Sequence, residues 1–106
     1  MNIDMSYTTK VAKLNDEFRK SGFGMTLTQG VQALEDLSGL LWAVQNYNRF
    51  TEDNDPYHEH DFGTIEWYGE KVFFKIDYYD QKLEYGEEPL SPNCKRVMTI
   101  MLANEY

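Results

Sequence analysis

The chain has 106 residues, of which 42% are hydrophobic and 15% aromatic, so it is predicted to form one globular domain, 1–106, rather than a disordered acidic tail. Its formal net charge of −8 at pH 7 argues against direct binding to nucleic acid or to an anionic membrane. No apolar run approaches the length of a membrane span. Residues 1–7 are expected to be loosely ordered.

A first helix is predicted after Thr8 or Thr9, either of which can cap it. Apolar residues then recur at helical spacing on one face: Val11, Leu14 and Phe18. Glycine at positions 22 and 24 predicts the end of this helix. The short alternating segment 25–28 that follows is predicted to be a strand.

A second helix is predicted over residues 34–47, because apolar residues form a continuous stripe at helical spacing: Leu37, Leu40, Leu41, Val44 and Tyr47. Residues 48–62 are rich in Asn, Asp, Pro and His, which is typical of an ordered loop.

The clearest β signal is the alternation of apolar and polar residues over 64–78, interrupted at Gly69. It predicts an antiparallel hairpin with one apolar face, formed by Ile65, Trp67, Val72, Phe74 and Ile76. An acidic loop over 80–93 follows.

A last helix is predicted to open at residues 91–93, with Val97, Ile100 and Met101 facing inward. Like elements come in runs rather than in strict strand–helix alternation. The predicted fold class is therefore α+β, with a small antiparallel sheet built around a hairpin at 63–78 and about three helices packed on one face.

The charge is distributed very unevenly. Residues 1–50 contain five acidic and five basic residues, whereas residues 51–106 contain thirteen acidic and five basic ones. A one-sided negative field selects cationic partners. We therefore predict an acidic and aromatic partner-binding surface made of Glu52, Asp53, Asp55, Tyr57, Glu59, Asp61, Tyr79, Asp80, Glu84, Tyr85, Glu87 and Glu88.

Such a surface can occupy a groove that normally holds phosphates and so compete with DNA or RNA. The alternative is that these charges form an ordinary solvated face. A structural or regulatory homodimer that buries its spare aromatic residues is a further possibility.

Residues 58–61, His-Glu-His-Asp, have side chains of the kind that bind metals. If a metal binds at all, its ligands are expected to be His58, His60, Asp55 and Asp61. The spacing is looser than that of a zinc signature. We favour a structural turn, in which Asp side chains bond backbone amides, and expect no metal and no other cofactor.

The runner-up interpretation is a metal-dependent or histidine-based hydrolase centred on His58 and His60, in which either histidine could act as a general base oriented by a carboxylate. No Ser or Cys lies in a recognisable nucleophile motif, and no glycine-rich phosphate loop is present. Cys94, the single cysteine, is expected to be a small buried residue in a reducing compartment. We predict no catalytic residues.

Five blocks of the chain resemble a bacterial family, domain of unknown function 3768. They comprise 14–16 with Arg19, 28–31, 50–63, 75–80 and 96–106. The resemblance extends from Thr9 to the last residue and implies no established activity, substrate or catalytic residue. It implies a setting on bacterial plasmids and in phage-like regions, where proteins that block host defence occur.

The sequence thus predicts a non-enzymatic, cytoplasmic protein of a bacterial host cell that acts by binding another protein. In its most concrete form it is an anti-defence, anti-CRISPR-like inhibitor. Its partner is expected to have a basic surface, as a nuclease or another nucleic-acid-binding defence protein does. The first residues lack a basic and then apolar stretch, so no signal peptide is expected.

Overall fold

The computed structural model describes residues 6–106. Most of the segment expected to be loosely ordered, residues 1–5, lies outside the described residues. Ser6 and Tyr7 do not fit that expectation, because Ser6 caps helix α1 (Tyr7–Ser21) and Tyr7 begins it. The Ser6 hydroxyl accepts a hydrogen bond from the backbone N–H of Thr9 at 3.2 Å, so the prediction that Thr8 or Thr9 caps this helix is wrong.

Helix α1 ends as predicted, because Gly22 takes the left-handed conformation with φ 75°. Its buried face differs from the predicted one. Leu14 is 38% exposed, whereas the polar residues Asn15 and Arg19 are buried together with Val11. Relative to the prediction, the face of α1 that points into the protein is shifted towards Asn15 and Arg19, because both side chains have hydrogen-bond partners inside the protein.

The middle of the chain forms the short strand β1 (Met25–Leu27) and two helices, α2 (Gln29–Gln32) and α3 (Leu37–Gln45). Strand β1 lies where a strand was predicted. The helix predicted over residues 34–47 is present as α3, which is shorter than predicted at both ends. Asp36 caps α3 by accepting a hydrogen bond from the Gly39 N–H at 3.2 Å. The apolar stripe is confirmed where it is central, since Leu40 and Val44 are fully buried.

The hairpin is confirmed as β2 (Phe62–Trp67) and β3 (Glu70–Tyr79). Its two-residue turn, Tyr68-Gly69, has φ of 50° and 82°, as the turns that match strand twist require. Strand β4 (Lys95–Leu102) and a 3-10 helix, η1 (Ala103–Glu105), follow.

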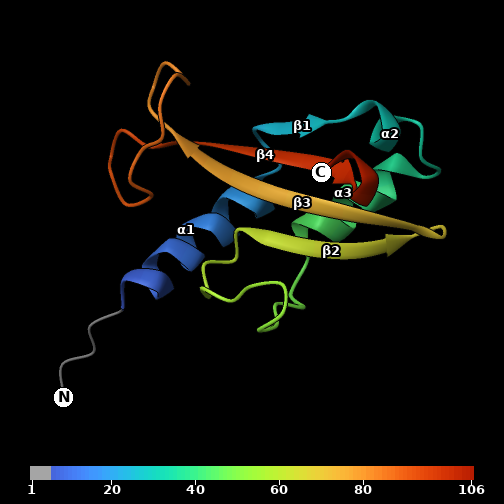
Figure 1. The fold of residues 1–106 in the computed structure, drawn as a ribbon, viewed down its shortest axis with the longest axis horizontal. Coiled ribbons are helices and arrows are strands. Elements are labelled where there is room, and N and C mark those ends of the chain that lie inside the picture. The colour runs from blue at the N-terminus through green and yellow to red at the C-terminus, as the bar shows by residue number, and fades with distance from the viewer. Residues whose placement is uncertain (1–5) are drawn as a thin grey trace.

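The sheet order is β1-β4-β3-β2, with β1 parallel to β4 and the other pairs antiparallel (Figure 1). The fold class is therefore α+β, and residues 6–106 form three α-helices and a mixed four-stranded sheet that is mostly antiparallel.

The predicted last helix is wrong, because its residues form β4 at the centre of the sheet. Val97, Ile100 and Met101 fit a helical period, but Met98 and Ile100 fit the strand period equally well. Pairing with both β3 and β1 decides between the two, since tertiary contacts override weak local preference. Met98 and Ile100 are fully buried in the core.

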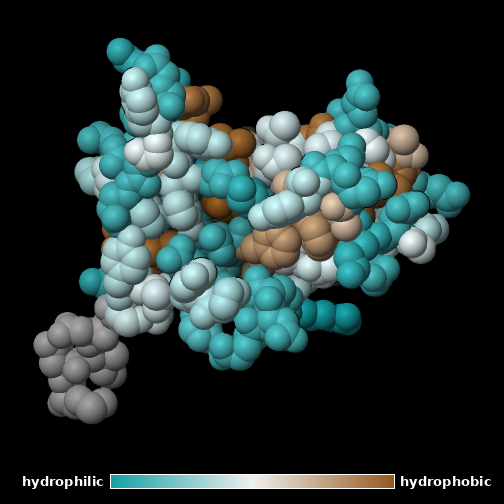
Figure 2. Space-filling model, in the orientation of Figure 1, coloured by the Kyte–Doolittle hydropathy of each residue, from teal (hydrophilic) through white to brown (hydrophobic). Residues whose placement is uncertain are grey.

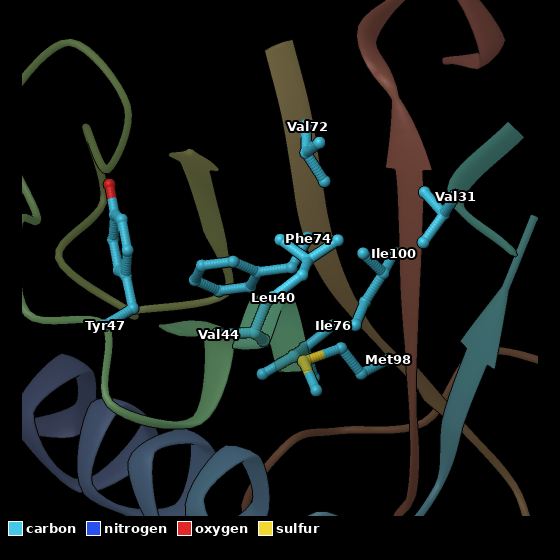
Figure 3. Packing of buried hydrophobic residues seen from close by; sticks show 9 residues of the cluster. All are labelled: Val31, Leu40, Val44, Tyr47, Val72, Phe74, Ile76, Met98 and Ile100. Atoms are coloured by element: carbon cyan, nitrogen blue, oxygen red, sulfur yellow. The ribbon is translucent and has the colours of Figure 1, made fainter. Parts of the chain in front are cut away.

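One core fills the space between the helices and one face of the sheet (Figure 3). Its buried members come from α2, α3, β3 and β4, together with one tyrosine after α3: Val31, Leu40, Val44, Tyr47, Val72, Phe74, Ile76, Met98 and Ile100. Of the residues predicted to face inward from the hairpin, Ile65 and Trp67 lie at the margin of this core and are only partly buried.

The opposite face of the sheet carries a smaller aromatic group. Phe62 contacts Phe73, with 5.0 Å between ring centroids, and Tyr106 packs against both at 6.0 and 5.7 Å. Figure 2 shows hydrophobic side chains gathered over β2 and β3 on this face, surrounded by hydrophilic ones. Across residues 6–106, none of the helices has the length and apolar character needed to span a membrane.

A glycine substitution tests the packing of β2 on the core. A Cβ added at Gly63 would lie 2.3 Å from the Phe74 ring and 2.8 Å from the Tyr47 ring. We expect Gly63→Ala to lower the free energy of unfolding by about 1–3 kcal/mol, because overpacking displaces both rings. Gly86→Ala is the matched control, since its Cβ would meet nothing closer than 4.0 Å. Equal denaturant midpoints for the two variants would contradict this packing.

Candidate functional site

Two loops, together with Tyr79 at the end of β3, carry the residues predicted to bind a partner. Residues 46–61 precede β2, and residues 80–94 join β3 to β4. Figure 1 shows the first half of α1 between these loops. The Tyr7 hydroxyl donates a hydrogen bond to the Glu88 carboxylate, and the Asn15 side chain bonds the Glu59 carbonyl oxygen at 2.9 Å. Helix α1 therefore contacts both loops through side-chain hydrogen bonds.

The predicted surface residues differ in exposure. Six of them are exposed: Glu52, Asp53, Tyr57, Glu84, Tyr85 and Glu88. Five are half-buried: Glu59, Asp61, Tyr79, Asp80 and Glu87. Asp55 was expected on the surface but is only 3% exposed. Its carboxylate accepts hydrogen bonds from backbone N–H groups of the loop instead of facing a partner.

Asp55 organises the turn that contains both histidines. Its Oδ1 accepts hydrogen bonds from the N–H groups of Glu59 and His60 at 3.0 and 3.1 Å. His58 and His60 both have φ 59°, an uncommon conformation for residues other than glycine. The structural turn favoured from the sequence is the arrangement found.

The structure does not bring all four residues considered as metal ligands together, although His60 Nε2 lies 3.8 Å from Asp55 Oδ2. His58 lies 3.5 Å from the Glu52 carboxylate. His60 places its Nδ1 3.0 Å from Asp16 Oδ1 and stacks on Phe50, with 4.0 Å between ring centroids. Within residues 6–106 no three or more His, Cys, Asp or Glu side chains are grouped so that they could hold a metal ion.

Asn15 is the hydrogen-bonding centre of the contact between α1 and the rest of the protein, and it is fully buried. Its Nδ2 donates to the Glu59 carbonyl oxygen at 2.9 Å and to the Tyr78 hydroxyl at 2.8 Å. Its Oδ1 accepts from Arg96 Nε at 2.7 Å. One amide thus joins a helix, a loop and two strands. An asparagine next to an apolar helical stripe was the only sequence signal for this role.

Arg19 lies one helical turn further along α1 and is 1% exposed. Its guanidinium donates to Asp16 Oδ1 and to the Tyr47 carbonyl oxygen, each at 3.0 Å. It also lies over the rings of Phe50 and Phe74, at 5.2 and 5.6 Å from their centroids. A buried cation needs such partners to offset the loss of its hydration.

Carboxylates accumulate where β2 begins. Burial raises the pKa of Asp61, and the neighbouring carboxylates of Glu59, Asp55 and Asp77 raise it further. Asp77 is paired with Lys75 at 3.2 Å.

The contact between α1 and the second loop also changes a pKa. The hydrogen bond from the Tyr7 hydroxyl to the Glu88 carboxylate raises the pKa of Tyr7 to about 12.

The acidic residues of the two loops have no Lys or Arg partner. Within the described part of the chain, the pairs with Lys or Arg are Arg19–Asp16 and Lys75–Asp77. Two acids in the loops are paired, and both have histidine partners: Glu52 with His58 and Asp55 with His60. This end of the molecule therefore presents negative charge without internal compensation.

The enzyme interpretation gains one element of geometry, because Asp16 orients His60 through Nδ1. The cleft beside His60 is lined by Asp16, Arg19, Lys20, Asn46, Tyr47, Asn48 and Phe50. It contains no serine, threonine or cysteine. Burial raises the pKa of the Cys94 thiol, which lowers the fraction of reactive thiolate. The histidine-based enzyme therefore stays a prediction, and the residues that line this cleft do not include a serine, threonine or cysteine nucleophile for it.

Removal of the Asn15 side chain tests the junction. Asn15→Ala leaves Arg96 Nε, the Tyr78 hydroxyl and the Glu59 carbonyl without this partner. We expect the free energy of unfolding to fall by about 3 kcal/mol, because buried polar groups without partners are costly. Asn104→Ala, at an exposed position, should change it by less than about 0.5 kcal/mol. A loss at Asn15 no larger than at Asn104 would show that the junction does not stabilise the fold.

The pH dependence of stability tests the carboxylate cluster. The pKa of Asp61 in the folded protein is raised from 3.8, so the unfolded chain releases this proton at lower pH. Ionisation of Asp61 therefore costs stability as the pH rises through this interval. We expect Asp61→Asn to raise the melting temperature at pH 7 and to leave it almost unchanged at about pH 3. Asp53→Asn is the exposed control, and an equal gain at both pH values would contradict the cluster.

In a comparison with family models, residues 27–105 match a protein family of unknown function, DUF3768. Comparisons with curated proteins and with solved structures find no match. The matched residues include both loops and the whole sheet apart from the first two residues of β1. They leave out Asn15 and Arg19, so the first of the five blocks lies outside them. Since the match covers well over half of the chain, the protein belongs to the DUF3768 family.

Proposed function

We propose that this protein is a non-enzymatic binding module whose acidic loops occupy a basic surface of another protein. The observation that carries the proposal is the set of loop carboxylates without a Lys or Arg partner within residues 6–106. Charges that are not neutralised internally attract a complementary partner and speed association with it.

Tyrosines accompany these carboxylates. Tyr57 is 76% exposed on the first loop and Tyr85 is 72% exposed on the second. Tyrosine provides apolar contact area together with a polar hydroxyl, which suits it to protein interfaces. Carboxylates mixed with exposed aromatic rings resemble the phosphates and bases of a nucleic acid strand.

In its finer form the proposal is that the partner's surface normally binds DNA or RNA, so that this protein excludes the nucleic acid. An anti-defence inhibitor of the anti-CRISPR type, acting in the cytoplasm of a bacterial cell, fits this behaviour. The supporting physical argument is electrostatic competition for the same basic groove.

Charge reversal in each loop tests the proposal. We would compare wild type with one variant that carries both Glu52→Lys and Asp53→Lys and with a second that carries Glu84→Lys alone. These three residues are exposed, and Glu88 is left intact because it bonds Tyr7 of α1. Capture of partners from a bacterial lysate should weaken strongly in at least one of these two variants and should weaken with rising salt. Duplex DNA or RNA added to the wild-type complex should release the captured protein.

The control is reversal of Lys10 and Lys13 to Glu on the exposed face of α1, which should leave capture unchanged. Capture that resists salt, both acidic reversals and added nucleic acid would overturn the proposal. It would favour instead an apolar interface, such as the homodimer considered from the sequence.

A further inference from the structure

Two clefts of about 430 Å³ each flank the segment that follows α3. Asn46, Tyr47 and Asn48 line both of them, so the clefts share a wall. Each volume falls within the range of roughly 300–1,000 Å³ that is typical of small-molecule sites. None of the residues proposed to bind a protein partner lines either cleft.

The charge of the first cleft is opposite to that of the chain. Arg19 and Lys20 line the first cleft and Arg49 lines the second, against two acids, Asp16 and Glu66. Asp16 is already paired with Arg19 and His60. Among the described residues, Lys20 and Arg49 have no carboxylate within ion-pair distance. The first cleft is therefore locally cationic on a protein of net charge −8, whereas the charges that line the second cleft balance.

Arg19 lines the first cleft and contributes positive charge to it. Its two terminal nitrogens are hydrogen-bonded within the protein, and its Nε is buried. Lys20, which is exposed, is therefore the cation in this cleft that can donate to the oxygens of a bound phosphate.

The second cleft has an aromatic wall. Trp42 and Trp67 line it, and Trp42 is 67% exposed. The Trp67 indole N–H donates to the Glu35 carbonyl oxygen at 2.8 Å, which fixes this ring. Exposed indole faces stack well on nucleobases, and arginine adds a cation–π contribution.

We propose that the two clefts together bind one mononucleotide. Its phosphate lies in the first cleft near Lys20 and Arg19, and its base lies in the second cleft against Trp42. The shared wall carries the Asn46 and Asn48 amides, which can donate to and accept from the edge of the base. The net charge of −8 disfavours a longer nucleic acid strand, because its additional phosphates would meet acidic surface.

The chain offers its own reporter, since its only two tryptophans both line the second cleft. Titration with adenosine 5′-monophosphate should change the tryptophan fluorescence and saturate. Adenosine alone and inorganic phosphate alone should each bind more weakly than the nucleotide, because each fills one cleft. A 5′-phosphorylated single-stranded oligonucleotide distinguishes a strand end from a free nucleotide, and we expect it to bind more weakly than the free nucleotide.

Matched variants locate the two halves of the site. Lys20→Gln should weaken nucleotide binding about tenfold and leave adenosine binding unchanged, as expected for loss of one charged hydrogen bond. Lys10→Gln on the same helix is its control. Trp42→Ala, followed by calorimetry, should weaken both ligands, whereas Phe23→Ala, at a position 77% exposed, should weaken neither.

Three outcomes would overturn the proposal. They are absence of saturable binding of the nucleotide at millimolar concentration, binding that Lys20→Gln and Trp42→Ala leave unchanged, and an oligonucleotide that binds more tightly than the free nucleotide.

Discussion

The arrangement of this protein depends on two polar side chains that α1 places in the interior. Asn15 and Arg19 are almost fully buried, and between them they bond two loop or turn carbonyl oxygens, a tyrosine hydroxyl, an aspartate and a second arginine. A helix that buried only apolar residues could dock in several rotations. These directional bonds allow one rotation, because any other leaves buried polar groups without partners.

The position of α1 in turn determines both candidate sites. On one side it bonds the loops that carry the acidic and tyrosine residues, through Tyr7 and Asn15. On the other side it contributes Arg19 and Lys20 to the wall of a cleft. The acidic loops and the clefts thus lie on one framework, and residues 46–50 and His60 of the first loop line the clefts as well.

The hairpin, β1, the C-terminal end of α1 and the buried centre of α3 could be predicted from the sequence, because alternation, helical spacing and Gly22 are local signals. Strand β4 could not, since its apolar residues fit both periods and only its pairing partners decide. The exposed loop acids were predictable from composition. The burial of Asp55, Asn15 and Arg19 was not, because polar residues are normally exposed and their partners come from distant segments.

Hydrogen exchange at the amides of Glu59 and His60, which both bond Asp55, tests most directly whether α1 holds the first loop in place. Arg19→Met keeps an unbranched side chain but removes the bonds to Asp16 and Tyr47. If the account is right, protection at these two amides falls far more than at the amides of β3 and β4. Unchanged protection at Glu59 and His60, or an equal loss in the central strands, would contradict it.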